Sequence, residues 1–211
     1  MDMREFQLLL HCARSQPNAG FIRGAVTEGI DWRTLLDLAR RHRVQPLLIR
    51  SLKSACWDVV PRKSQVEQES SYRDTVAQNL FLTGELLQLL DILGKQGIAT
   101  AALKGPVLAE ALYGDLSLRE FVDLDVFVHE ADICKAEQAL IARGYKSYSP
   151  DEDYRFAFLS YYGQQPFRGQ TGIIVDLHWR LANKSVALPV RSAAVWERLQ
   201  NVTIAGRTVP R

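Results

Sequence analysis

Three aspartates in this 211-residue chain lie inside short apolar runs rather than at the ends of such runs. Asp123 and Asp125 are two residues apart in one run, and Asp176 lies in another. Because side chains alternate along a β-strand, Asp123 and Asp125 would share one face, and Asp176 would share its face with His178. If the two strands pair side by side, the three carboxylates converge and require a cation. The pattern predicts Mg²⁺ or Mn²⁺ and a phosphorylated substrate.

A simpler interpretation is that each acid caps a helix or points to solvent, as acids near strand ends commonly do. These acids instead lie within the runs 122–128 and 173–177, where an unpaired charge is costly. Clusters of perturbed acids are found preferentially at functional sites. We therefore favour a functional group of carboxylates over a structural one.

A candidate phosphate-binding turn precedes the first acidic run. Lys104, Gly105 and Pro106 lie where a short strand should give way to a helix. Glycine allows the backbone to approach a ligand, proline suits the first helical turn, and exposed N–H groups favour a phosphate. Lys104 adds a positive charge for the same group. The alternative is an ordinary strand-to-helix turn with an exposed lysine.

Two further side chains are candidates for substrate binding. Arg119 lies four residues before Asp123 and would neutralise either an acid or a substrate phosphate; a structural arginine–carboxylate pair explains it equally well. His178 follows Asp176 by two residues and would orient a carboxylate or contact substrate. A histidine that merely bonds a backbone carbonyl is the alternative.

Composition excludes several classes of protein. The 26 basic and 24 acidic residues give a net charge of +2. This charge is too small to indicate general binding to nucleic acids. No apolar stretch of 18 residues occurs and the N-terminus has no signal-peptide pattern, so we expect a cytoplasmic protein without a membrane partner. The widely spaced Cys12, Cys56 and Cys134 predict reduced core thiols.

Periodicity divides the chain into a helical region, 1–97, and an α/β core, 98–211. In the first region a helix is predicted after the N-cap Asp31, and a long helix over 65–95 carries two adjoining apolar stripes. The second region predicts strands at 98–103, 122–128, 154–161 and 172–179, helices at 106–113 and 130–143, and a hairpin at 202–209. The fold class is therefore α/β (α+β), with a small mixed sheet. The chain stops just after this hairpin, as a C-terminally truncated protein would.

Several segments together resemble a known family. Over about residues 98–181, the chain resembles the uncharacterised nucleotidyltransferase family of the polymerase-beta superfamily. The motifs that carry the resemblance are Leu103-Lys104-Gly105, Leu112-Tyr113-Gly114-Asp115, Leu118-Arg119, Asp123-Leu124-Asp125-Val126-Phe127-Val128 and Val175-Asp176-Leu177-His178-Trp179-Arg180-Leu181. The helical segment 32–52 also resembles the N-terminal region of this family.

The resemblance implies a site and a reaction. Asp123 and Asp125 would form the DxD pair, Asp176 the third acid, and Gly105 the glycine of the phosphate loop. Such acids hold two divalent ions, Mg²⁺ or Mn²⁺, around a nucleoside triphosphate (NTP). A substrate hydroxyl attacks the α-phosphorus and pyrophosphate leaves.

The resemblance therefore implies transfer of a nucleoside monophosphate from an NTP to a hydroxyl on a protein or small molecule. Two positions depart from the usual pattern, and the first of them, together with a C-terminal truncation of the chain, favours an alternative function. Pro106 follows Gly105 where the superfamily usually has serine, and Val122 precedes the DxD pair where relatives often have glycine. The alternative is a catalytically weak nucleotide-binding or antitoxin-like regulatory module. A two-metal phosphoesterase is a further alternative, which no additional cluster of metal ligands supports.

Overall fold

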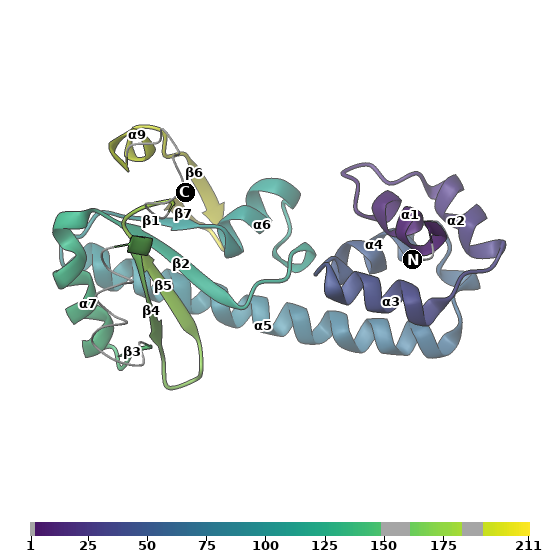
Figure 1. Cartoon of the computed structure of the whole chain (residues 1–211), viewed down its shortest axis with the longest axis horizontal. Helices are drawn as coiled ribbons and strands as arrows, with labels where there is room; N and C mark the ends of the chain where they lie inside the picture. The colour runs from purple at the N-terminus through teal and green to yellow at the C-terminus, as the bar shows by residue number, and fades with distance from the viewer. Residues whose placement is uncertain (1–2, 149–160, 183–191) are drawn as a thin grey trace. The chain divides into compact units, whose positions relative to one another are not determined.

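The computed structural model describes residues 3–148, 161–182 and 192–211 (Figure 1). The chain divides into two compact units, the first comprising Met1–Asn79 with Tyr113–Glu120 and the second Leu80–Leu112 with Phe121–Arg211. The 34-residue helix α5 (Arg62–Lys95) contributes to both units. The domain boundary at residue 97 stays a prediction.

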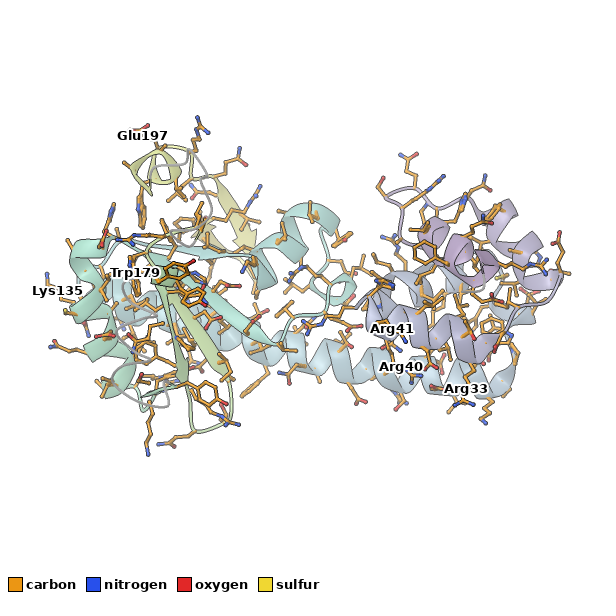
Figure 2. The ribbon with its side chains drawn as sticks, in the orientation of Figure 1. Arg33, Arg40, Arg41, Lys135, Trp179 and Glu197 are labelled. Atoms are coloured by element: carbon orange, nitrogen blue, oxygen red, sulfur yellow. The ribbon has the colours of Figure 1, made fainter. Side chains whose placement is uncertain are left out.

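The first unit is helical. It contains α1 (Met3–Cys12), α2 (Ala19–Thr27), α3 (Trp32–Arg41), α4 (Gln45–Ala55) and the short 3₁₀ helices η1 (Trp57–Val59) and η2 (Leu116–Leu118). The apolar faces of α1 to α4 form one core, which includes Leu8, Ile22, Leu35, Leu48 and Leu52. Asp31 caps α3 as predicted, because its side chain accepts hydrogen bonds from the backbone N–H groups of Arg33 and Thr34. Figure 2 labels the exposed Arg33, Arg40 and Arg41 on this helix.

The second unit is built on a mixed sheet of five strands in the order β1-β2-β5-β4-β3. The strands are β1 (Thr100–Leu103), β2 (Asp123–Val128), β3 (Lys146–Ser147), β4 (Gln164–Arg168) and β5 (Ile174–His178). β2 is antiparallel to β1 and parallel to β5. The predicted mixed sheet is confirmed, and β2 and β5 lie side by side near its centre.

Three helices of this unit were predicted from their periodicity. They are the second half of α5, α6 (Gly105–Tyr113) and α7 (Ile133–Ala142), which follows the 3₁₀ helix η3 (Glu130–Asp132). Leu82, Leu86, Leu89 and Leu93 of α5 are fully buried, which confirms one of the two predicted apolar stripes. Leu80, which was predicted to lie in the other stripe, is instead 59% exposed. Just after α7, the Tyr145 hydroxyl donates a hydrogen bond to Glu85 of α5 at 2.8 Å. This bond connects the segment just after α7 to α5.

The C-terminal segment contains α9 (Ser192–Trp196) and a hairpin of β6 (Asn201–Ile204) and β7 (Arg207–Pro210). The predicted hairpin is confirmed. Its two turn residues, Ala205 and Gly206, have φ values of 49° and 77°, as a type I′ turn requires. The predicted strand at 154–161 lies almost entirely outside the described residues.

The structure also bears on two expectations drawn from the composition, those about membrane spans and about the cysteines. No helix among the described residues combines the length and apolar character needed to span a membrane. Cys12 and Cys56 are buried, whereas Cys134 is exposed on α7, so the prediction of a core thiol is wrong at that position. Cys134 lies on the side of the helix opposite the buried Ala136 and Leu140, which form the packed face.

Candidate metal and phosphate site

The two acidic strands pair in a register that brings Asp125 and Asp176 directly opposite each other. Paired residues of adjacent strands project from the same face of a sheet, so these two carboxylates are neighbours. Asp123 lies two residues earlier on that face, opposite Ile174, and His178 lies two residues after Asp176. The alternation predicted from the apolar runs therefore places all four side chains on one face.

Asp125 is the centre of the polar contacts at this site. Its carboxylate is only 4% exposed, and its Oδ1 atom lies 2.8 Å from Nε2 of His178 and 2.9 Å from Nζ of Lys104. Burial opposes ionisation of Asp125, but the hydrogen bonds from His178 and Lys104 outweigh it and hold its pKa below the ordinary value. The carboxylate is therefore a stable, localised negative charge.

The surroundings of Asp176 shift its pKa in the direction opposite to that of Asp125. Burial raises its pKa above the ordinary value, and the nearby charges of Asp125 and Asp123 add to the rise, while His178 opposes it. No hydrogen-bond donor to its carboxylate compares with the two that neutralise Asp125 among the described residues. A bound cation would relieve this unfavourable charge.

One atom each from Asp125, Asp176 and His178 forms a compact group in which all separations are within 4.8 Å. Two carboxylates and an imidazole are an appropriate donor set for a divalent metal ion. Asp123 lies outside this group as the described part of the chain places it. These residues fit the divalent ion that the sequence predicted, although the group that converges contains His178 in place of Asp123.

The predicted phosphate-binding turn lies between β1 and α6. Lys104 and Gly105 both have positive φ values, 48° and 42°, which reverse the chain direction after the strand. A Cβ atom at Gly105 would lie 3.7 Å from the carbonyl oxygen of Asp123, so the turn packs closely against β2. The Lys104 side chain is 60% exposed and directs its ammonium group to Asp125. Sequence reasoning anticipated the position of Lys104 but not this ion pair.

Arg119 belongs to the first compact unit, where it directly follows η2. Its carbonyl oxygen accepts a hydrogen bond from Nδ2 of Asn79 at 2.8 Å. Its Nη1 atom is buried and has no hydrogen-bond partner among the described residues. Its role in substrate binding stays a prediction.

An aromatic cluster next to the acids was not predicted. The ring of Trp196 in α9 stacks on Phe127 at a centroid distance of 5.2 Å and on His129 at 3.9 Å. Phe127 follows Asp125 on the same face of β2 and is paired with His178. Trp196 therefore covers one end of the acidic face. No local sequence signal connects it with a strand that lies about 70 residues earlier.

Gly163 fixes the chain just beyond β5. Its carbonyl oxygen accepts hydrogen bonds from the backbone N–H groups of Trp179 and Arg180 at 3.0 and 3.1 Å. A Cβ atom at Gly163 would lie 2.5 Å from Cβ of Arg180, and φ is +71°. We expect Gly163→Ala to lower the free energy of unfolding by about 2–3 kcal/mol, because overpacking adds to backbone strain. Urea denaturation measures this loss.

Gly172→Ala is the matched control for that substitution. Gly172 also has a positive φ, +84°, but no atom lies within 4 Å of the place that a Cβ atom would occupy. We expect this change to cost only about 1 kcal/mol, from the backbone conformation alone. Equal losses in the two variants would contradict the importance of the contact between Gly163 and Arg180.

The chain belongs to the uncharacterised nucleotidyltransferase family, whose model matches residues 28–211. The resemblance seen in the sequence is therefore confirmed, and the match extends into the N-terminal helices. Among solved structures, the lincomycin-bound crystal structure of the lincosamide antibiotic adenylyltransferase LnuA is similar, with a TM-score of 0.42 and 18% sequence identity. This similarity covers 60% of the present chain and 77% of LnuA. No curated protein is significantly similar to the chain.

Proposed function

We propose that this protein is a metal-dependent nucleotidyltransferase that moves a nucleoside monophosphate from an NTP to a hydroxyl group on a protein or small molecule. Membership of the nucleotidyltransferase family is the general support. The specific observation that carries the proposal is the pairing of Asp125 with Asp176 on parallel strands, where Lys104 contacts the same carboxylate cluster. In the proposed reaction, this arrangement would place a cation site next to a phosphate site.

Each residue has a distinct role in the proposed reaction. Asp123, Asp125 and Asp176 would hold up to two ions, Mg²⁺ or Mn²⁺, on the face of β2 and β5 that carries the acids. When bound, the ions would lower the pKa of the acceptor hydroxyl and neutralise charge on the triphosphate. Lys104 would bind a phosphate oxygen through its ammonium group.

The turn after β1 would complete the phosphate site. Gly105 lets the backbone approach the triphosphate and begins α6, a nine-residue helix whose positive end favours an anion. His178 is the remaining candidate for substrate contact within this unit. With the acceptor oxygen held in line with the α-phosphorus, the new O–P bond forms as the bond to pyrophosphate breaks.

The second candidate function is a catalytically weak nucleotide-binding or antitoxin-like regulatory module. Pro106 favours it, because the residue after Gly105 is buried and has no hydroxyl or N–H to offer a phosphate. The ion pair of Lys104 with Asp125 also occupies the group proposed to bind phosphate. Such a module would bind NTP without transferring any part of it.

Acceptor-dependent release of pyrophosphate separates the two functions. We expect release from an NTP only when Mg²⁺ or Mn²⁺ and a hydroxyl acceptor are both present. Fractionated small molecules and proteins serve as acceptor pools, and an enzyme-coupled assay measures pyrophosphate. Tight NTP binding with no release from any pool would favour the regulatory module.

Lys104→Met tests the proposed phosphate contact. We expect about a 10-fold weaker affinity for the NTP and an almost unchanged affinity for the nucleoside, because only the NTP carries the charge that the ammonium group binds. Equilibrium dialysis with Mn²⁺ measures both affinities. Lys135→Met removes an exposed lysine on α7, labelled in Figure 2, and is the matched control. Equal losses for nucleoside and NTP in Lys104→Met would argue against phosphate binding.

A further inference from the structure

We propose that His178 is a metal ligand and that one ion is held by Asp125, Asp176 and His178, a mixed oxygen and nitrogen site that prefers Mn²⁺ and similar transition-metal ions to Mg²⁺. This inference rests on the proposed function, because it concerns the same face of β2 and β5. It changes the expected ligand set of the first ion. Asp123 is left to a second ion.

The separations between the three groups fit a single ion. At metal–ligand distances of about 2.1–2.2 Å, adjacent ligands of a six-coordinate ion lie roughly 3.0 Å apart and opposite ligands about 4.3 Å apart. Nε2 of His178 lies 2.8 Å from Oδ1 of Asp125, and the whole group lies within 4.8 Å. Small side-chain adjustments would therefore give all three atoms bonding distances to one ion.

Burial and strand pairing hold this group in place. The side chains of His178 and Asp125 are only 8% and 4% exposed, and both project from adjacent strands in the sheet. The two strands restrict the backbone, and Trp196 stacks on Phe127, the residue paired with His178. A preorganised imidazole of this kind binds metal without a large loss of side-chain entropy.

Binding a metal would exchange one interaction of His178 for another. Nε2 cannot both donate a hydrogen bond to Asp125 and give its lone pair to an ion. On binding, the lone pair of Nε2 would go to the ion, the proton that Nε2 had donated would pass to solvent or to Nδ1, and the contact with Asp125 would become a contact through the shared ion. The 2.8 Å contact thus shows that Nε2 of His178 and Oδ1 of Asp125 are close enough to share one ion.

The nature of the donors determines the preferred ion. Mg²⁺ favours oxygen ligands and keeps several waters, whereas imidazole suits transition-metal ions. A site with one imidazole and two carboxylates therefore favours Mn²⁺ over Mg²⁺. The set of three aspartates implied by the family resemblance has no such preference for nitrogen-binding ions.

Pulsed electron paramagnetic resonance of the full chain loaded with Mn²⁺ tests this ligand directly. We expect electron spin-echo modulation from a directly bound imidazole ¹⁴N, which changes to the ¹⁵N pattern when histidine is isotopically labelled. We expect His178→Gln to abolish the modulation and to weaken Mn²⁺ binding about 10-fold or more. Glutamine is informative because its side-chain N–H can still donate to Asp125, while its amide nitrogen is no metal ligand.

His42→Gln is the matched control, because it makes the same change at an exposed histidine. We expect it to retain the nitrogen modulation and to change the affinity for Mn²⁺ less than about 3-fold, since His42 lies outside the compact group. Bound Mn²⁺ without nitrogen modulation in the wild-type chain would overturn the inference. Unchanged Mn²⁺ affinity in His178→Gln would also overturn it, because His178 would then act as a hydrogen-bond donor.

The inference and the proposed function fail in different ways. Nucleotide transfer supported by an ion that has only oxygen ligands would leave the transferase intact and contradict the role of His178. Nitrogen-bound Mn²⁺ without transfer would support the ligand assignment and contradict the enzyme. The labelled wild-type chain gives the decisive spectrum even where a variant does not fold.

Discussion

Asp176→Asn is expected to reduce nucleotide transfer by about 10³-fold or more, equivalent to about 4 kcal/mol of transition-state stabilisation. Asp176 lies opposite Asp125 and would hold the ion nearest the acceptor, so its neutral replacement weakens activation of the acceptor hydroxyl. Transfer of label from an NTP at saturating nucleotide measures the loss. Asp74→Asn, an exposed acid on α5, is the matched control and should retain full activity.

The same substitution should not unfold the protein. The folded state raises the pKa of Asp176, so the folded chain binds this proton more tightly than the unfolded chain does. The resulting cost to stability develops as pH rises through the unfolded pKa toward the folded one, and is fully present above both. Asn removes it, so the free energy of unfolding at pH 7 should be unchanged or higher. Marked destabilisation at pH 7 would indicate a structural role for Asp176.

Asp125→Asn is expected to have the opposite effect on stability, lowering the free energy of unfolding by about 2 kcal/mol at pH 7. The carboxylate accepts hydrogen bonds from the largely buried His178 and from Lys104. Most of the loss should come from His178, because the exposed lysine is screened by solvent. Urea denaturation of both proteins measures the difference.

The pH dependence of that difference follows from the lowered pKa of Asp125. A carboxyl group with a lowered folded pKa stabilises the protein above its unfolded pKa, about 3.9, and the contribution is lost as pH falls through the folded pKa. The wild-type advantage should therefore be constant near neutrality and disappear at strongly acidic pH. An advantage that grows on acidification, or equal stability at pH 7, would contradict the role assigned to this ion pair.

The strands that carry the site could be predicted because their alternation is unusually clear. Leu124, Val126 and Val128 are buried on β2 as expected, while Asp123 and Asp125 project from the other face. Trp179, which directly follows β5 and is labelled in Figure 2, is also buried. Local periodicity determines which face each side chain occupies.

Contacts between distant segments could not be predicted in the same way. The parallel register of β2 with β5 depends on tertiary packing, and no local pattern specifies it. The ion pair between Lys104 and Asp125 depends on two positive φ values in the turn after β1. Trp196 reaches Phe127 from a separate helix. These interactions arise from the assembled fold, and they determine how the predicted acids are arranged.

Transfer from an NTP labelled separately on its α- and γ-phosphates tests the proposed function most directly. Nucleotidyl transfer places the α-label on the acceptor and releases the γ-label as pyrophosphate, whereas phosphoryl transfer places the γ-label on the acceptor. With Mn²⁺ and an acceptor, we expect α-label on the acceptor in an amount equal to the pyrophosphate released, and neither product with Asp176→Asn. Binding of NTP with no α-label on any acceptor, or with γ-label there instead, would contradict a nucleotidyltransferase.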